Sequence, residues 1–320
     1  MRPMPLHADG YTFELAAEVQ RTPVKYRNRY GIELAADLYR HRDLDAATSH
    51  AGVVIGPPHG GVKEQGAGIY GQQLAARGLV TLVFDHSYNG ESGGAPRHLT
   101  SPEIFAEDFS AGVDYLGTLE FVDRDRIGAL GLCGSGGFVL NAARGDVRIR
   151  AVVTSAMYDI SRVSRRGWRD SMSESERAQL LADIAEQRWE DVDSNRPALT
   201  PSYPDEVPEE GFDPITDEFF EYYVSDRGRH PHATGAFTVT SAPSHISYGS
   251  LRYLGDLRPR PLLLITGEHA HSKYFSEDLA RDYDGPKDLI VVPDARHIDL
   301  YDRVELIPFD AIEDFFRSAL

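Results

Sequence analysis

The sequence predicts an α/β fold in which helices flank a mostly parallel central sheet that is interrupted by one long, largely helical insertion. Short apolar runs alternate with helical stretches of ten or more residues, and right-handed crossovers turn that alternation into a parallel sheet. One run ends in the glycine-rich turn 131–137, which leads directly into a helix. About a hundred residues then separate two later strands, which is too long for a simple connection.

The expected elements begin with an antiparallel pair of strands at 24–30 and 34–39. The run 53–55 is wholly apolar, which is typical of a strand that is buried on both faces of a parallel sheet. A helix is expected over 64–77, and Gly78 closes it as a C-cap. These residues therefore predict the start of the alternating pattern.

The pattern continues to the end of the chain. The further strands are expected at 79–84, 127–132, 151–155, 261–266 and 289–292, and the further helices at 102–119, 138–143 and 308–319. The strands are short and rich in branched apolar residues, as buried strands usually are. We therefore expect residues 1–160 and 256–320 to form the core of the fold.

Residues 161–255 form the insertion. The stretch 173–189 is expected to be helical, because Ser173 and Glu176 fit a capping box at its start. Open α/β sheets bind ligands at the carboxyl edge of their strands. We therefore expect the insertion to be a lid over that edge, with a peripheral decoration as the alternative.

Composition excludes several classes of function. The net charge of −17 argues against nucleic-acid binding, and no 18-residue apolar run suggests a membrane span. A single cysteine excludes an intrachain disulfide and fits the reducing cytoplasm. The N-terminus lacks the pattern of a signal peptide, and no dinucleotide or P-loop motif is present. We expect a cytoplasmic protein without cofactor or metal that acts on a small acyl substrate, and a homodimer is left open.

The turn 131–137 has the pattern of a nucleophile elbow, a sharp bend that needs small residues two positions on either side of the nucleophile. Gly131 and Ser135 meet this need around Cys133. Most single cysteines are small buried residues without a chemical role, and Ser135 is a rival nucleophile with glycine neighbours of its own. We favour Cys133 because the apolar strand ends at Leu132.

A thiol nucleophile needs a base, because the thiolate is the reactive form. His297 follows the strand 289–292 and precedes the final helix, which is the expected place for the base. The oxyanion hole should use the N–H of Gly134 and one from the loop after the early strand, where His59 and Gly60 are the candidates.

The orienting acid is not evident. It usually lies three residues beyond the glycine that follows the strand 261–266, but that residue here is Ala270. Glu268 on the same loop is the preferred candidate, and Asp159 is the alternative. A Cys–His pair can also work without a strong acid, since a thiol needs little activation.

Four segments carry a family resemblance, and they cover most of the sheet but not the insertion: 60–65, 84–94, 131–137 and 297–302. With them, the chain resembles the dienelactone-hydrolase-like branch of the α/β-hydrolase superfamily, and more closely a group of bacterial hydrolases with fungal polyketide-transferase relatives. The resemblance implies the α/β-hydrolase fold, with Cys133 in the place of the nucleophile and His297 in that of the base. Ala270 departs from the aspartate of dienelactone hydrolases, so the acid is not carried over.

Three functions follow as hypotheses. The first is hydrolysis of an ester, lactone or thioester through an acyl group on Cys133, with His297 as general base. The second is acyl transfer or cyclisation of a bulky, polyketide-like substrate by the same pair, for which an aromatic-rich lid would exclude water. The third is a non-covalent lyase, isomerase or binding protein on a hydrolase scaffold, which the missing aspartate motivates.

Overall fold

The computed structural model describes residues 6–320, and its centre is an eight-stranded sheet in the order β1-β2-β4-β3-β5-β6-β7-β8. The strands are β1 (Val19–Arg27), β2 (Glu33–His41), β3 (His50–Gly56), β4 (Val80–Phe84), β5 (Val122–Leu132), β6 (Ile149–Ser155), β7 (Leu262–Gly267) and β8 (Lys287–Val292). β1 pairs with β2, and β2 with β4, in antiparallel fashion, and the other pairs are parallel. The predicted mostly parallel sheet is confirmed.

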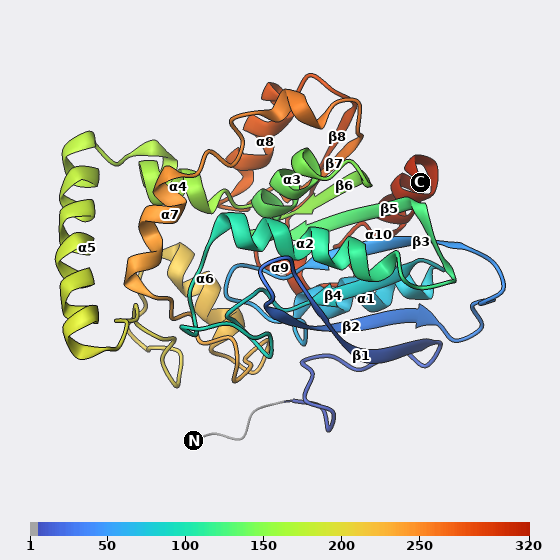
Figure 1. Cartoon of the computed structure of the whole chain (residues 1–320), viewed down its shortest axis with the longest axis horizontal. Coiled ribbons are helices and arrows are strands. Elements are labelled where there is room, and N and C mark those ends of the chain that lie inside the picture. Colours follow the sequence, from blue (N-terminus) through green and yellow to red (C-terminus); the bar gives the residue numbers. More distant parts are fainter. Residues whose placement is uncertain (1–5) are drawn as a thin grey trace.

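Helices cover both faces of the sheet (Figure 1). One apolar core forms beneath α1 (Gly66–Ala76), α9 (Asp299–Asp302) and α10 (Phe309–Ala319). The second forms beneath α2 (Pro102–Leu116), α3 (Ser135–Gly145) and α8 (Lys273–Asp282). Strands β3, β4 and β6 and the second half of β5 lie between these cores, which is why these segments are mostly apolar.

The insertion lies between β6 and β7 and extends beyond one end of the sheet, with α5 farthest from it (Figure 1). Its elements are α4 (Ile160–Arg166), η1 (Trp168–Asp170), α5 (Glu174–Ser194), α6 (Pro214–Tyr223), η2 (Val239–Ser241), α7 (Ala242–Ser247) and η3 (Leu254–Leu257). The capping box is present, because Ser173 accepts the N–H of Glu176 and the Glu176 carboxylate accepts the N–H of Ser173. The helical character predicted for this segment is thus found, whereas its function as a lid stays a prediction.

The structure moves some predicted boundaries. The helix after the elbow begins at Ser135 rather than at 138, so it starts immediately after the bend. The short helices α4, α7 and α9 were not expected, because segments of four to seven residues carry too little periodicity to be recognised.

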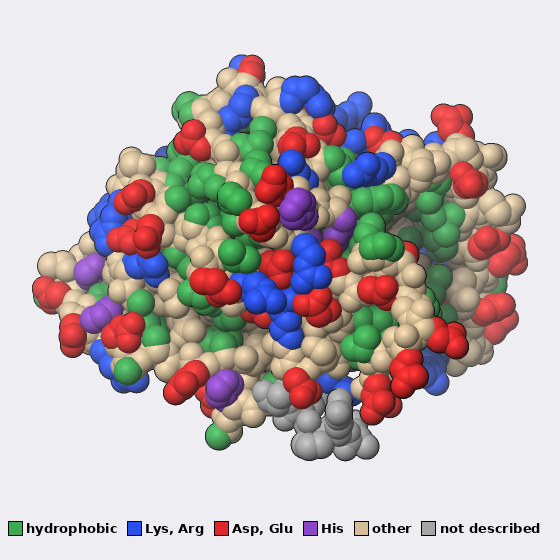
Figure 2. Space-filling model, turned by 180° about the vertical axis from the view of Figure 1, so that it is seen from behind, with side chains coloured by type: hydrophobic (Ala, Val, Ile, Leu, Met, Phe, Trp, Pro, Cys, Tyr) green, Lys and Arg blue, Asp and Glu red, His purple; other side chains and the backbone are tan. Residues whose placement is uncertain are grey.

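Acidic and basic side chains both lie on the surface of the molecule. Figure 2 shows Asp and Glu side chains scattered among Lys and Arg over the visible face. Within residues 6–320, no helix has both the length and the apolar character that crossing a membrane requires.

Candidate active site

Cys133 lies at the sharp bend between β5 and α3. Its φ of 51° is in the left-handed region, which is unusual for a residue with a side chain and is typical of a strained elbow. Its N–H donates to the carbonyl of Ser155 (3.0 Å), and its own carbonyl accepts from the N–H of Tyr158 (2.9 Å). A side chain at Gly131 would collide with the backbone of Ser135, so the bend requires glycine there.

Ser135, the rival nucleophile, is fully buried. Its hydroxyl donates to the carbonyl of Pro57 and accepts a hydrogen bond from Nε2 of His86 (2.8 Å), and Nδ1 of His86 lies 3.7 Å from the Asp108 carboxylate. These three side chains resemble a catalytic triad in composition, but the serine is engaged with the backbone. They hold Pro57, at the start of the loop that contains His59, and they leave Cys133 as the candidate nucleophile.

Two backbone donors are directed at the sulfur. The N–H groups of Gly134 and His59 lie close enough to Sγ of Cys133 to favour its thiolate, which is the arrangement expected of an oxyanion hole. Gly60 has a φ of +85°, and a side chain there would meet Phe237 of the insertion at 2.9 Å. Gly60 therefore allows the insertion to pack closely on this loop, while His59 provides the N–H.

Two of the segments that carry the resemblance meet behind this loop. The Asp85 carboxylate accepts the N–H of Lys63 (2.8 Å) and the N–H of Glu91 (2.8 Å). The buried ammonium of Lys63 pairs with Glu91 (2.7 Å) and with Glu64. This network fixes the backbone that follows His59, so it supports the position of the second oxyanion donor.

The Cys133 thiol is protonated at neutral pH. Burial raises its pKa to about 11, although hydrogen bonds from Tyr301, Gly134 and His59 favour the thiolate and oppose the rise. The thiol therefore needs a group that removes its proton during the reaction rather than before it.

This pKa predicts the pH dependence of alkylation. A thiol with a raised pKa is neutral below that pKa, so the rate of modification by iodoacetamide should rise about tenfold per pH unit between pH 7 and 10. It should show no plateau in that range. Mass spectrometry of the quenched samples measures the rate at Cys133, the single cysteine of the chain. A plateau near pH 7 would show that the free enzyme carries a preformed thiolate.

His297 is fully buried and lies in a chain of hydrogen bonds that ends at Cys133. Its Nδ1 is 2.6 Å from the Ser272 hydroxyl, and its Nε2 is 3.1 Å from the Tyr301 hydroxyl. The Tyr301 side chain also lies close enough to the Cys133 thiol for the two groups to shift each other's pKa. If Nδ1–H donates to Ser272, the lone pair of Nε2 faces Tyr301. Burial and the neighbouring His271 lower the pKa of His297 well below its usual value, so the ring is neutral.

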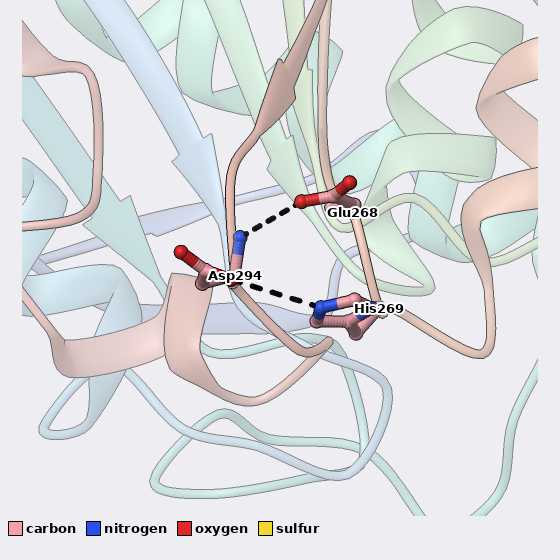
Figure 3. Close-up of side chains that lie close together, drawn as sticks. All are labelled: Glu268, His269 and Asp294. Atoms are coloured by element: carbon pink, nitrogen blue, oxygen red, sulfur yellow. Dashed lines mark hydrogen bonds and ion pairs between the residues drawn. The ribbon is translucent and has the colours of Figure 1, made fainter.

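Glu268 does not orient His297, and this corrects the sequence assignment of the acid. The Glu268 side chain is exposed, and its carboxylate accepts the N–H of Asp294 (3.1 Å), as Figure 3 shows. Asp159, the alternative, is occupied as the N-cap of α4, where it accepts the N–H of Arg162 (2.9 Å). The glutamate follows β7 directly, and the loop turns its side chain outward before the chain reaches His297.

Sequence reasoning did not assign a role to Ser272 or Tyr301. Tyr301 lies four residues after His297, and this spacing places both side chains on one face of the helical turn. Ser272 lies two residues beyond Ala270, so the loop presents a hydroxyl to the ring where a carboxylate was expected. The spacing of His297 and Tyr301 was readable in the sequence, whereas the choice of Ser272 required coordinates.

Glu268 and Ser272 are the two candidates for the group that orients His297, and substitution of each residue distinguishes them. Glu268→Gln should change kcat by less than about twofold, because an exposed side chain away from the ring is replaced by an isostere. Ser272→Ala should lower kcat by about tenfold, because Nδ1 of His297 loses a buried partner. Steady-state hydrolysis of a p-nitrophenyl ester measures both. A larger loss in Glu268→Gln than in Ser272→Ala would restore the glutamate as the acid.

Glu268, His269 and Asp294 also bring two carboxylates and an imidazole within 4.8 Å of one another (Figure 3). All three side chains are exposed, and exposed groups of this kind are common without a metal. They do not include Cys133 or His297, so the chemistry considered below does not use them.

The insertion encloses the thiol. The rings of Tyr203 and Tyr223 lie near Cys133, and the ring of Phe219 lies 5.6 Å from that of His297. Cys133 is 5% exposed in this arrangement. A surface cavity of about 670 Å³ is lined by Asp159 and other residues of the insertion and α8, but Cys133 does not line it.

Salt bridges and hydrogen bonds fasten the insertion to the loop that carries His297. Glu221 pairs with Arg296 (2.8 Å), and Arg227 pairs with Asp302 (2.7 Å). The Glu218 carboxylate accepts the N–H of Ile298 (2.9 Å). These contacts lie on either side of His297, so the position of the imidazole depends on the insertion.

No family model matches the sequence, but several known proteins are similar to it over most of its length. The uncharacterized protein PA2218 of Pseudomonas aeruginosa is 47% identical over 312 residues, which are 97% of this chain and 83% of the relative. The uncharacterized protein YcjY of Escherichia coli is 36% identical over 296 residues, 92% and 96% of the two chains. Acyltransferase drtE of Aspergillus calidoustus is 25% identical over 303 residues, 89% and 90% of the two chains.

Solved structures show the same fold. The crystal structure of hypothetical protein PA2218 matches with a TM-score of 0.93 at 46% identity, over 97% of both chains. The α/β hydrolase GrgF from Penicillium sp. sh18 matches with a TM-score of 0.75 at 20% identity, over 94% and 99% of the chains. Dienelactone hydrolase from Anabaena variabilis matches with a TM-score of 0.53 at 14% identity, over 95% and 99%. The last two likenesses support the fold alone.

Proposed function

We propose that this chain, which belongs to the same family as PA2218 and YcjY and has the fold of α/β hydrolases, cleaves an ester, lactone or thioester through an acyl group carried on Cys133. One observation carries the proposal. The sulfur of Cys133 lies at a strained bend, where the N–H groups of Gly134 and His59 and the Tyr301 side chain all lie close enough to favour its thiolate. A nucleophile, two oxyanion donors and a path for its proton therefore meet at one atom.

In the first half of the reaction, Sγ of Cys133 attacks the substrate carbonyl carbon. The thiol proton passes to the oxygen of Tyr301 while the phenolic proton passes to Nε2 of His297, so the net transfer is from sulfur to imidazole. The carbonyl oxygen becomes an oxyanion and accepts the N–H groups of Gly134 and His59. The bond to the leaving group then breaks, and that group takes the proton from His297.

In the second half, an acceptor attacks the thioester carbonyl and releases the acyl group from Cys133. Water as the acceptor gives hydrolysis, and an alcohol or amine gives acyl transfer or ring closure. The enclosure of the thiol by Tyr203, Tyr223 and Phe219 favours a bulky apolar acyl group and limits water. Acyl transfer is therefore the second candidate, and the drtE relative is named as an acyltransferase.

Substrate access requires the insertion to move. Cys133 is 5% exposed and His297 is fully buried, so a substrate cannot reach either in this arrangement. The same segment supplies Glu221 and Arg227, which fasten the loop of His297. The insertion therefore acts as a lid whose closure both excludes water and places the base.

The proposed proton path is tested by Tyr301→Phe. This substitution keeps the ring and removes the hydroxyl that contacts both Cys133 and His297. We expect kcat to fall by about 100-fold, because proton transfer by a positioned group contributes about that much, while KM changes little. Steady-state kinetics with a p-nitrophenyl ester measure both constants.

Tyr222→Phe is the matched control for that experiment, since Tyr222 is also fully buried and its hydroxyl accepts the N–H of Gly66 instead. It should retain most of kcat. If both variants behave like the parent protein, His297 receives the thiol proton without Tyr301.

A further inference from the structure

A second, partly buried imidazole lies beside His297 and has no part in the mechanism above. The rings of His271 and His297 are 4.6 Å apart and inclined by 32°. His271 follows β7 in the same loop as Ser272, and its side chain is 9% exposed. It is thus an imidazole at the candidate active site that the acylation of Cys133 does not require.

A carboxylate holds this imidazole in place. Oε2 of Glu218 lies 3.1 Å from Nδ1 of His271, and Oε1 of Glu218 accepts the N–H of Ile298 (2.9 Å). The Glu218 side chain is 8% exposed, so both partners are shielded from water. Because the backbone N–H of Ile298 holds one oxygen of Glu218, the other oxygen is positioned to orient the His271 ring.

The contact with Glu218 defines the chemistry of the ring. A carboxylate oxygen accepts hydrogen bonds, so Nδ1 of His271 carries a hydrogen, and in the neutral ring Nε2 carries the lone pair. That Nε2 is buried and has no hydrogen-bond partner within residues 6–320. A buried acceptor without a partner is uncommon and marks a place where another molecule is able to bind. An imidazole held by a carboxylate at Nδ1, with a free Nε2, has the arrangement of a general base.

Three aromatic rings surround the His271 imidazole. The rings of Phe219, Trp168 and Tyr158 lie 5.4, 5.7 and 6.0 Å from that of His271. Tyr158 also leads back to the elbow, because its N–H donates to the carbonyl of Cys133. The pair thus joins the insertion, which provides Glu218, to the loops around the thiol.

We propose that His271, held by Glu218, is a second catalytic base, which takes the proton of the acceptor that releases the acyl group from Cys133. The inference rests on the proposed function and deepens it. As the acceptor oxygen bonds to the thioester carbonyl carbon, its proton passes to Nε2 of His271, the C–S bond breaks and the thiolate leaves. When the product departs, His271 releases the proton and Cys133 regains one, so only the acceptor is consumed. His297 serves acylation, and His271 serves deacylation.

The use of two bases explains why alanine, rather than the usual aspartate, stands at position 270. The carboxylate that usually contacts the first histidine is absent at that position, and a carboxylate from the insertion contacts the neighbouring histidine instead. Because Glu218 lies on α6, the second base is complete only when the insertion is closed. Release of the acyl group is then coupled to the closed state.

The test separates the two halves of the reaction in His271→Gln. In stopped-flow experiments with p-nitrophenyl acetate, the rate constant of the first turnover should stay within about threefold of the parent. The steady-state rate should fall by about 100-fold, because a general base contributes about that much. The acetyl group should then accumulate on Cys133. Glu218→Gln should show the same pattern with a smaller loss, and His269→Gln, an exposed neighbour, should match the parent.

Turnover in the presence of hydroxylamine distinguishes a catalytic role of His271 from a structural one. It attacks thioesters without a general base, so it should restore turnover of His271→Gln to near the parent rate. Equal losses in the first turnover and in the steady state, with no rescue by hydroxylamine, would overturn the second base. Turnover by the parent without any acetyl group on Cys133 would instead overturn the proposed function, and this inference with it.

Discussion

Replacing Cys133 with alanine is expected to lower kcat for ester cleavage by about 10,000-fold or more, because the covalent intermediate is lost. The oxyanion donors of Gly134 and His59 remain, so a small residual rate should persist. Alanine is smaller than cysteine and fits the same bend, so the circular dichroism spectrum and the thermal midpoint should stay close to those of the parent. Initial rates of p-nitrophenol release measure the loss.

Ser135→Ala is the informative control, because Ser135 has the alternative nucleophile position. Its hydroxyl holds the carbonyl of Pro57, so its removal should loosen the loop of His59 and lower kcat by about tenfold. A greater loss in Ser135→Ala than in Cys133→Ala would move the nucleophile to the serine. Full activity of a folded Cys133→Ala would exclude acyl transfer to Cys133.

Replacing His297 with glutamine is the second large effect, with kcat expected to fall by about 1,000-fold. Glutamine retains polar atoms near Ser272 and Tyr301 but does not take up a proton at neutral pH. The thiol, whose pKa burial raises to about 11, would then stay protonated during attack. The activity that remains should increase with pH up to that value, because hydroxide replaces the missing base.

The exposed His269→Gln is again the control, and it should retain the activity of the parent. Pre-steady-state kinetics locate the defect, since the loss in His297→Gln should fall on the first turnover. A His297→Gln variant with a normal first turnover would contradict the role of His297 in acylation.

The sheet and the elbow could be predicted from sequence because their determinants are local. The wholly apolar runs of β3 and β6 specify burial on both faces. Gly131 and Ser135 around Cys133 specify the bend, which the φ of 51° at Cys133 confirms as geometry. In both cases the residues that determine the structure are neighbours along the chain.

The surroundings of His297 could not be predicted in the same way, because they depend on contacts between distant segments. Glu268 is near the expected position in sequence, but the loop after β7 turns it toward Asp294. The carboxylate that does enter this region is Glu218, which lies about 80 residues before His297 on a helix of the insertion. No local pattern marks such a residue, since its role depends on how α6 packs against the core.

The most direct measurement of the central claim is mass spectrometry of the protein quenched in acid within seconds of mixing with activated esters and thioesters. We expect a mass gain equal to one acyl group, located on the peptide that contains Cys133 and absent from Cys133→Ala. The acyl groups that give the highest occupancy would also outline the substrate. Product formation with an unmodified Cys133, or with the acyl group on another residue, would contradict the account.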